Sequence, residues 1–167
     1  MQEAWRELIE ALEETLALYR HMLELSETKK NVLVRGKPVE LEAINREEES
    51  LLIKGSELEN RRAKATAVLV TAWDMANAKP SLDELAAVAT PDDGERLYTL
   101  KQEFAATLKE LSRLNAVNAK LTEQALAFVN YNLNLLTRRQ AEPTYAPAGA
   151  AAFKGSAMSA ALLDRKV

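Results

Sequence analysis

The most constraining feature of this sequence is a run of mostly apolar residues that recur at alternating spacings of three and four between Leu97 and Leu135. This spacing keeps one face of a helix apolar, and it is typical of helices that pack side by side at a shallow angle. The residues at these positions, called the seam below, are Leu97, Leu100, Phe104, Thr107, Leu111, Leu114, Asn118, Leu121, Ala125, Phe128, Asn132 and Leu135. We therefore expect a long helix whose seam lies in the core of a helical bundle.

The composition agrees with an all-α fold. The chain of 167 residues is 47% hydrophobic but only 5% aromatic, with five Gly and five Pro, which is typical of helices rather than sheets. Apolar residues at helical spacing predict helices over residues 3–35, 38–79 and 91–139. Because the first connection is short, the helices that it joins must run antiparallel. The predicted fold is an elongated, coiled-coil-like antiparallel three-helix bundle over residues 1–140, with a short connector helix.

Local signals mark where these helices begin and end. Gly36 and Pro38 end the first helix and start the second, since Gly favours the position after a helix and Pro favours its first turn. Ser81 and Glu84 have the spacing of a capping box, which predicts the start of the short connector helix. Thr90 is a predicted N-cap for the third long helix.

Polar residues interrupt the apolar stripe of the second helix. Gly55 lies in its interior, where Gly costs about 1 kcal/mol relative to Ala. Glu48 and Arg62 fall on the stripe itself. A bent or locally hydrated middle of the helix would explain these residues, and a functional notch is the alternative.

Charge and motif content argue against several function classes. A net charge of -3 and a pI near 5.4 argue against nucleic-acid binding, which needs a basic face. No apolar run approaches the length of about 18 residues that a membrane helix needs, and the N-terminus does not resemble a signal peptide, so we expect a cytoplasmic protein without membrane insertion. The chain has no Cys, no Gly-rich phosphate loop and one His, His21. We therefore expect no enzyme, no cofactor and no metal site.

The outer face of the third helix carries few charges. Between Leu114 and Leu136 the only charged residues are Lys120 and Glu123, whereas a surface helix normally solvates its outer face with Lys and Glu. Apolar residues beside the seam, called the flank below, are Leu126, Val129, Leu133 and Leu136. The flank either belongs to a wider core against two neighbouring helices or contacts another protein.

The composition changes after Arg139. Residues 141–167 form a tail rich in Ala and Pro that cannot build its own core. Met158 and Leu162, four residues apart, could lie on one short amphipathic helix when the tail is docked. Tyr145 either packs back onto the bundle or is a recognition point for another protein.

Several of these features together resemble the FlgN family of flagellar export chaperones. The matching elements are Arg61-Arg62, the Ser-Leu-x-Glu connector, Leu114-Asn115-x-x-Asn118-x-x-Leu121, Thr144-Tyr145-x-x-x-Gly149 and the terminal Leu163-Asp164-Arg165-Lys166-Val167. The resemblance covers essentially the full length of the chain. It implies a cytoplasmic, non-enzymatic chaperone that holds hook-filament junction (hook-associated) proteins unpolymerised and escorts them to the flagellar type III export gate.

The resemblance also implies roles for particular residues. Tyr145 matches the tail tyrosine implicated in docking to the export gate. Client binding falls on the Leu-Asn-x-x-Asn-x-x-Leu motif, the residues that follow it and the tail. The client-binding residues expected on this basis are Asn115, Asn118, Leu121, Thr122, Leu126, Val129, Leu133, Leu136, Met158 and Leu162. Because the flank is apolar, we also expect that, when no client covers it, the chain either forms weak homo-oligomers or folds its own tail over the flank through Met158 and Leu162.

Two other function classes remain open at this point. A structural coiled-coil adaptor would have the same three helices, but we would expect it to keep a charged outer face along the third. A di-metal carboxylate bundle would need two Glu-x-x-His pairs and further inward carboxylates, whereas this chain offers only His21 with Glu24.

Overall fold

The computed structural model describes residues 2–74 and 79–140, and the secondary structure in these ranges is entirely helical. The elements are α1 (Gln2–Arg35), α2 (Pro38–Ala72), α3 (Leu82–Val88) and α4 (Pro91–Gln140). The chain divides into two compact units, Met1–Asn130 and Tyr131–Val167. The predicted all-α fold is confirmed, and the tail of residues 141–167 lies outside the described residues.

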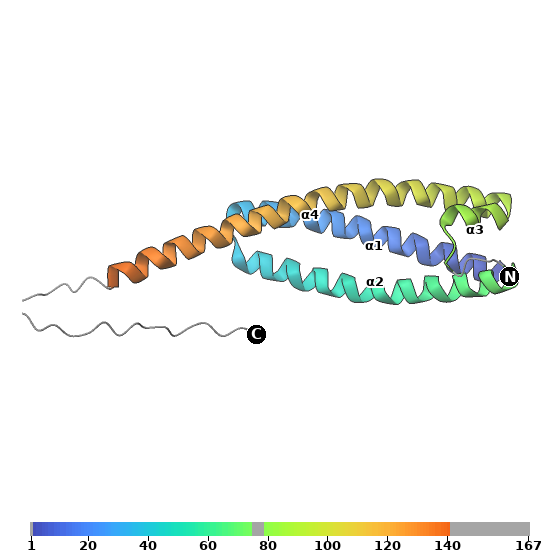
Figure 1. Ribbon diagram of the computed structural model, residues 1–167, viewed down its shortest axis with the longest axis horizontal. Helices are drawn as coiled ribbons and strands as arrows, with labels where there is room; N and C mark the ends of the chain where they lie inside the picture. The colour runs from blue at the N-terminus through green and yellow to red at the C-terminus, as the bar shows by residue number, and fades with distance from the viewer. Residues whose placement is uncertain (1, 75–78, 141–167) are drawn as a thin grey trace, which may run out of the picture. The chain divides into compact units, whose positions relative to one another are not determined.

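The long helices of the first unit run lengthwise along one another (Figure 1). Pairs of polar side chains fix their directions. In the pairs that join α1 to α2, a higher residue number in α1 goes with a lower residue number in α2, so these helices are antiparallel. Between α1 and α4 the numbers rise together, so these helices are parallel. The pairs are Arg61 with Glu7 and Glu14, His21 with Glu47, Arg96 with Glu13, and Arg20 with Glu103.

Two apolar clusters form the core of the first unit. The larger cluster lies at the α3 end and takes residues from all four helices, namely Trp5, Leu8, Leu12, Leu16, Ala65, Leu69, Leu85, Leu97 and Leu100. The smaller cluster lies toward the α1–α2 turn and consists of Leu25, Val32 and Ile44. Leu41 and Leu51 of α2, both partly buried, pack against the smaller cluster. The larger cluster at the α3 end is therefore the one to which all four helices contribute.

The seam of α4 is buried only in its first part. Its residues exposed by 9% or less are Leu97, Leu100, Thr107, Leu111, Leu114 and Asn118. Leu121 is half-buried, whereas Ala125 is exposed and Phe128 is 69% exposed. The expectation of a core face is therefore wrong for these two residues, and Leu135 in the second unit is exposed as well. Ala125 and Phe128 lie beside the α1–α2 turn, where α1 ends and leaves no further turn of helix to cover them.

Most predicted helix ends are confirmed. Gly36 has φ of +64° and its N–H donates to the Leu33 carbonyl at 3.2 Å, an arrangement that ends many helices. The capping box of Ser81 and Glu84 is present with both of its hydrogen bonds. The Thr90 side chain accepts a hydrogen bond from a backbone N–H in the first turn of α4 at 3.3 Å.

The predicted end of the second helix is wrong. We expected it to reach Lys79, but α2 ends at Ala72. The cause is Asp74, which has φ of +47°, a left-handed conformation that a short polar side chain tolerates but that stops a right-handed helix. The apolar stripe continues past this point in the sequence, so periodicity alone does not reveal the break.

Candidate functional site

The two Asn residues of the α4 motif tie that helix to α1. Asn118 is only 5% exposed, and its Nδ2 donates to the backbone carbonyl of Ser26 at 2.9 Å. The Ser26 hydroxyl, which is also on a buried residue, donates to Asn115 Oδ1 at 3.1 Å. Thr122 Oγ1 donates to the backbone carbonyl of Asn118 at 2.9 Å. The motif therefore has a structural role, since it joins α4 to α1 beyond the larger apolar cluster.

The side-chain oxygen of Asn118 has no hydrogen-bond partner among the described residues, although it is buried. The amide cannot simply be turned around, because its NH₂ group is the donor that the Ser26 carbonyl requires. A buried acceptor without a partner costs about 1 to 3 kcal/mol. The junction between α1 and α4 is therefore polar, and the Asn118 side chain is held in it by its hydrogen bond to the Ser26 carbonyl.

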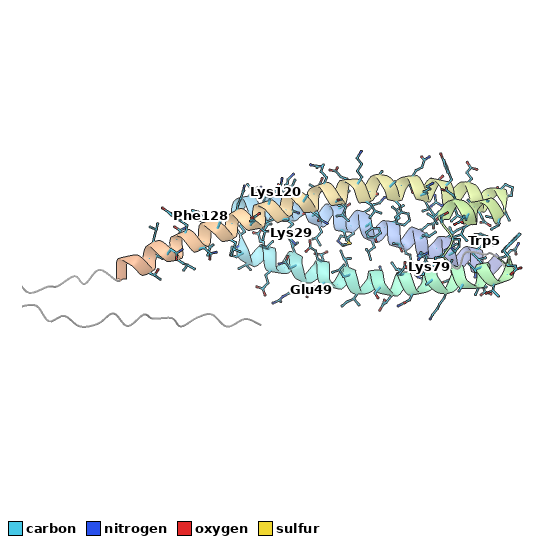
Figure 2. All side chains as sticks on the ribbon, in the orientation of Figure 1. Trp5, Lys29, Glu49, Lys79, Lys120 and Phe128 are labelled. Atoms are coloured by element: carbon cyan, nitrogen blue, oxygen red, sulfur yellow. The ribbon has the colours of Figure 1, made fainter. Side chains whose placement is uncertain are left out.

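An open trench of about 660 Å³ lies beside this junction, between α4, α1 and α2. Figure 2 labels Lys29 of α1, which lines this trench. The residues that line the trench are Met22, Ser26 and Lys29 of α1, Glu48 and Leu52 of α2, and Asn115, Asn118, Ala119, Thr122, Glu123 and Leu126 of α4. The trench thus has apolar side chains on both walls and a polar floor.

An ion pair between Lys29 of α1 and Glu48 of α2 lines part of the trench. Lys29 Nζ lies 2.6 Å from Glu48 Oε2, and the two side chains are 20% and 25% exposed. Each charge is thus neutralised by the other, as partly buried charges require. This pair explains why Glu48 is tolerated on the apolar stripe of α2.

The other polar interruptions of α2 lie outside the trench. Arg62 donates to Glu59 of the same helix at 2.7 Å, and this hydrogen bond lowers the pKa of the Glu59 carboxyl and raises the pKa of the guanidinium. A Cβ added at Gly55 would meet only Leu18 at 4.0 Å, so no close contact requires Gly there. Of the candidates for a functional notch, Glu48 lines the trench.

The flank of α4 is exposed. In the first unit, Leu126 is 60% exposed and Val129 is 51% exposed. In the second unit, Leu133 and Leu136 are exposed by 53% and 62%. The interpretation of the flank as part of a wider core is therefore wrong for the described residues, and the alternative of a surface that contacts another protein remains.

A second hollow, called the turn cleft below, lies where α4 passes the α1–α2 turn and has a volume of about 350 Å³. Phe128 lies on this part of α4 (Figure 2). The lining residues are Val32, Leu33, Gly36, Lys37, Pro38, Leu41, Ala125, Phe128 and Val129. The lining is almost wholly apolar, so the turn cleft could take an apolar side chain of a partner.

The predicted site residues are distributed over these hollows. Asn115, Asn118, Thr122 and Leu126 line the trench, and Val129 lines the turn cleft. Leu121 is half-buried and lines neither hollow. Leu133 and Leu136 are exposed residues of the second unit, and Tyr145, Met158 and Leu162 lie outside the described residues.

Sequence reasoning missed the walls that α1 and α2 contribute. Leu52 of α2 is 62% exposed and lines the trench, and Met22 and Lys29 of α1 line it as well. No local signal identifies these three residues, because the trench is formed only when three distant helices come together.

The described part of the chain also bears on metal binding and membrane insertion. His21 Nε2 lies 2.9 Å from Glu47 Oε1 on the exposed surface. Over residues 2–74 and 79–140, no three His, Asp or Glu side chains gather as they would around a metal ion. None of the helices in these ranges combines the length and apolar character that crossing a lipid bilayer requires.

Comparison with known proteins identifies the family. The family described as FlgN protein matches residues 1–152. This chain belongs to the FlgN family. In broad terms, membership of the FlgN family makes the chain a flagellar export chaperone that acts with flagellar proteins. A relative from Bacillus subtilis (strain 168), described as uncharacterized protein YvyG, is 26% identical over 133 residues, which cover 80% of this chain and 81% of the relative. No solved structure matches the chain.

Proposed function

We propose that this FlgN-family protein binds the amphipathic terminal helices of hook-filament junction (hook-associated) proteins on α4. In the cytoplasm it keeps these clients from assembling prematurely and delivers them to the flagellar type III export gate. The observation that carries the proposal is the exposed apolar flank of α4, in which Leu126 and Val129 are each more than half exposed. Exposed apolar side chains that gather on one helix in this way normally mark an interaction site.

The chemistry of α4 suits a helical client. Burying an apolar side chain such as Leu126 contributes about 1.5 to 3 kcal/mol. Asn115 and Thr122 beside the flank are polar but uncharged. They can hydrogen-bond to water in the free protein, and their desolvation on client binding costs less free energy than desolvation of Lys or Glu would. The exposed residues Leu133 and Leu136 of the second unit add apolar surface of the same kind. A structural adaptor without a client would have no need for such a surface.

Replacing Leu126 by Asp should weaken client binding at least about tenfold, because a charge then takes the place of a buried apolar contact. The measurement is titration calorimetry with the purified hook-filament junction protein. Tyr98→Asp is the matched control, since Tyr98 is 57% exposed on the same helix but lies at the α3 end. It should change the affinity by less than about a factor of two. Equal losses for both variants, or no loss for Leu126→Asp, would rule out the flank as the client surface.

We further propose that the tail has a second role. Met158 and Leu162 contact the client, and Tyr145 docks to the export gate while the client is held. Tyr145→Ala should then leave the client affinity within a factor of about two to three, and it should mainly reduce capture by the purified export-gate component. Loss of client binding by Tyr145→Ala, together with intact binding by Leu126→Asp, would show that the two roles are reversed.

A further inference from the structure

We infer that the trench takes one amphipathic helix of the client as a fourth helix, packed between α4 and α2 and resting on α1. This inference rests on the proposed function and extends the binding site from α4 to the other two helices. The occupant is a helix that is apolar on one face, carries no net charge there and places one amide side chain among its apolar residues.

The spacing of the lining residues indicates that the occupant is a helix. On α4, the lining residues Asn115, Ala119, Thr122 and Leu126 follow one another at spacings of four, three and four. On α1, Met22, Ser26 and Lys29 are spaced by four and three, and on α2 Glu48 and Leu52 are spaced by four. Alternation of three and four is the spacing with which one helix packs along another. Three helices thus present helix-packing positions to the same hollow.

Four of the lining positions on α4 form a second seam, distinct from the first. They are Asn115, Ala119, Thr122 and Leu126. The first seam already packs α4 on the bundle through Leu111, Leu114 and Asn118. The second seam has the same period. Asn115 at its start contacts Ser26 of α1, but all four of its residues are exposed, and Leu126 is 60% exposed. At this end of the first unit, the bundle therefore has room for one more helix.

The side chains around the trench define the chemistry of the occupant. Leu52 of α2 and Leu126 of α4 are 62% and 60% exposed on its two walls, and Ala119 of α4, which also lines the trench, is small. Apolar side chains of an incoming helix can therefore contact both walls. The Lys29–Glu48 pair is closed at 2.6 Å, so the occupant needs no charge to balance either partner.

The polar residues of the trench indicate that the occupant carries one hydrogen-bonding side chain. Asn115 and Asn118 both line the trench. The Oδ1 atom of Asn118 is buried, whereas Asn115 is exposed and can be reached by an occupant. An Asn or Gln side chain can donate and accept hydrogen bonds at once. Such a residue at the level of Asn115 would hydrogen-bond with the Asn115 amide, and a single polar residue in an apolar seam fixes the register of helix packing.

Two neighbouring residues of α2 give a matched test. Leu52 lines the trench, whereas Ile53, which is 66% exposed, does not. In titrations of the full chain with the purified hook-filament junction protein, Leu52→Asp should weaken binding at least about tenfold and Ile53→Asp should change it by less than about a factor of two. Leu52→Ser, which removes the apolar contact without adding a charge, should weaken binding in the same direction. Helicity and melting temperature of each variant confirm that the bundle is folded.

The outcomes separate this inference from the proposed function. If Leu126→Asp weakens binding and Leu52→Asp does not, the client lies on α4 alone and the inference is wrong while the proposed function stands. If neither substitution weakens binding, both are wrong. If both substitutions abolish self-association in light scattering and leave client binding unchanged, the occupant is a second copy of this chain, which also overturns the inference.

Discussion

Replacing Leu100 by Ala should lower the free energy of unfolding by about 2 to 5 kcal/mol. Leu100 is 0% exposed and belongs to the larger cluster, to which all four helices contribute. Ala would leave a cavity there that the surrounding side chains can fill only in part, so both burial and packing contacts are lost. Urea denaturation of the full chain, followed by circular dichroism, measures the change.

Leu108→Ala is the control for this prediction. Leu108 lies on the same helix, has the same side chain and is 42% exposed. Its replacement should cost less than about 1 kcal/mol, because no comparable cavity forms. Similar losses at both positions would mean that the larger cluster does not dominate the stability of the bundle.

Replacing Ala119 by Trp should weaken client binding about a hundredfold, because the indole would fill the trench and exclude about two apolar contacts of the client. Ala119 is exposed and lines the trench, so the larger side chain can project into the trench without disturbing the core. The measurement is the affinity for the purified hook-filament junction protein.

Ala116→Trp is the matched control, since Ala116 is also exposed on α4 but does not line the trench. This variant should bind the client within a factor of about two to three of the unchanged chain. If Ala119→Trp binds as tightly as Ala116→Trp, the client does not enter the trench. Unaltered melting temperatures would show that both variants are folded.

The helical fold could be predicted because its signals are local. The seam spacing correctly predicted burial at Leu97, Leu100, Thr107, Leu111 and Leu114, while Phe104 between them is half-buried. The caps at Gly36 and Ser81 act within one turn of helix. The end of α2 could not be predicted, because the apolar stripe of that helix runs on in the sequence past the left-handed Asp74.

The candidate site could be predicted only on the helix that carries the motif. The low charge of the third helix and its flank indicated an exposed surface, which Leu126 and Val129 provide. The same pattern did not distinguish Asn118, whose amide is buried in a helix–helix junction, from its exposed neighbour Asn115. Leu52 was missed because its role depends on how α2 lies relative to α4, which no sequence spacing specifies.

Hydrogen exchange of the full chain, with and without the purified hook-filament junction protein, tests the central claim most directly. A client helix in the trench should slow amide exchange over residues 115–129 of α4 and around Leu52 of α2, because binding stabilises these helices against local opening. Exchange at α3 and in the larger cluster should stay nearly unchanged. A complex that forms while residues 115–129 exchange as in the free chain would contradict the assignment of α4 as the client-binding helix.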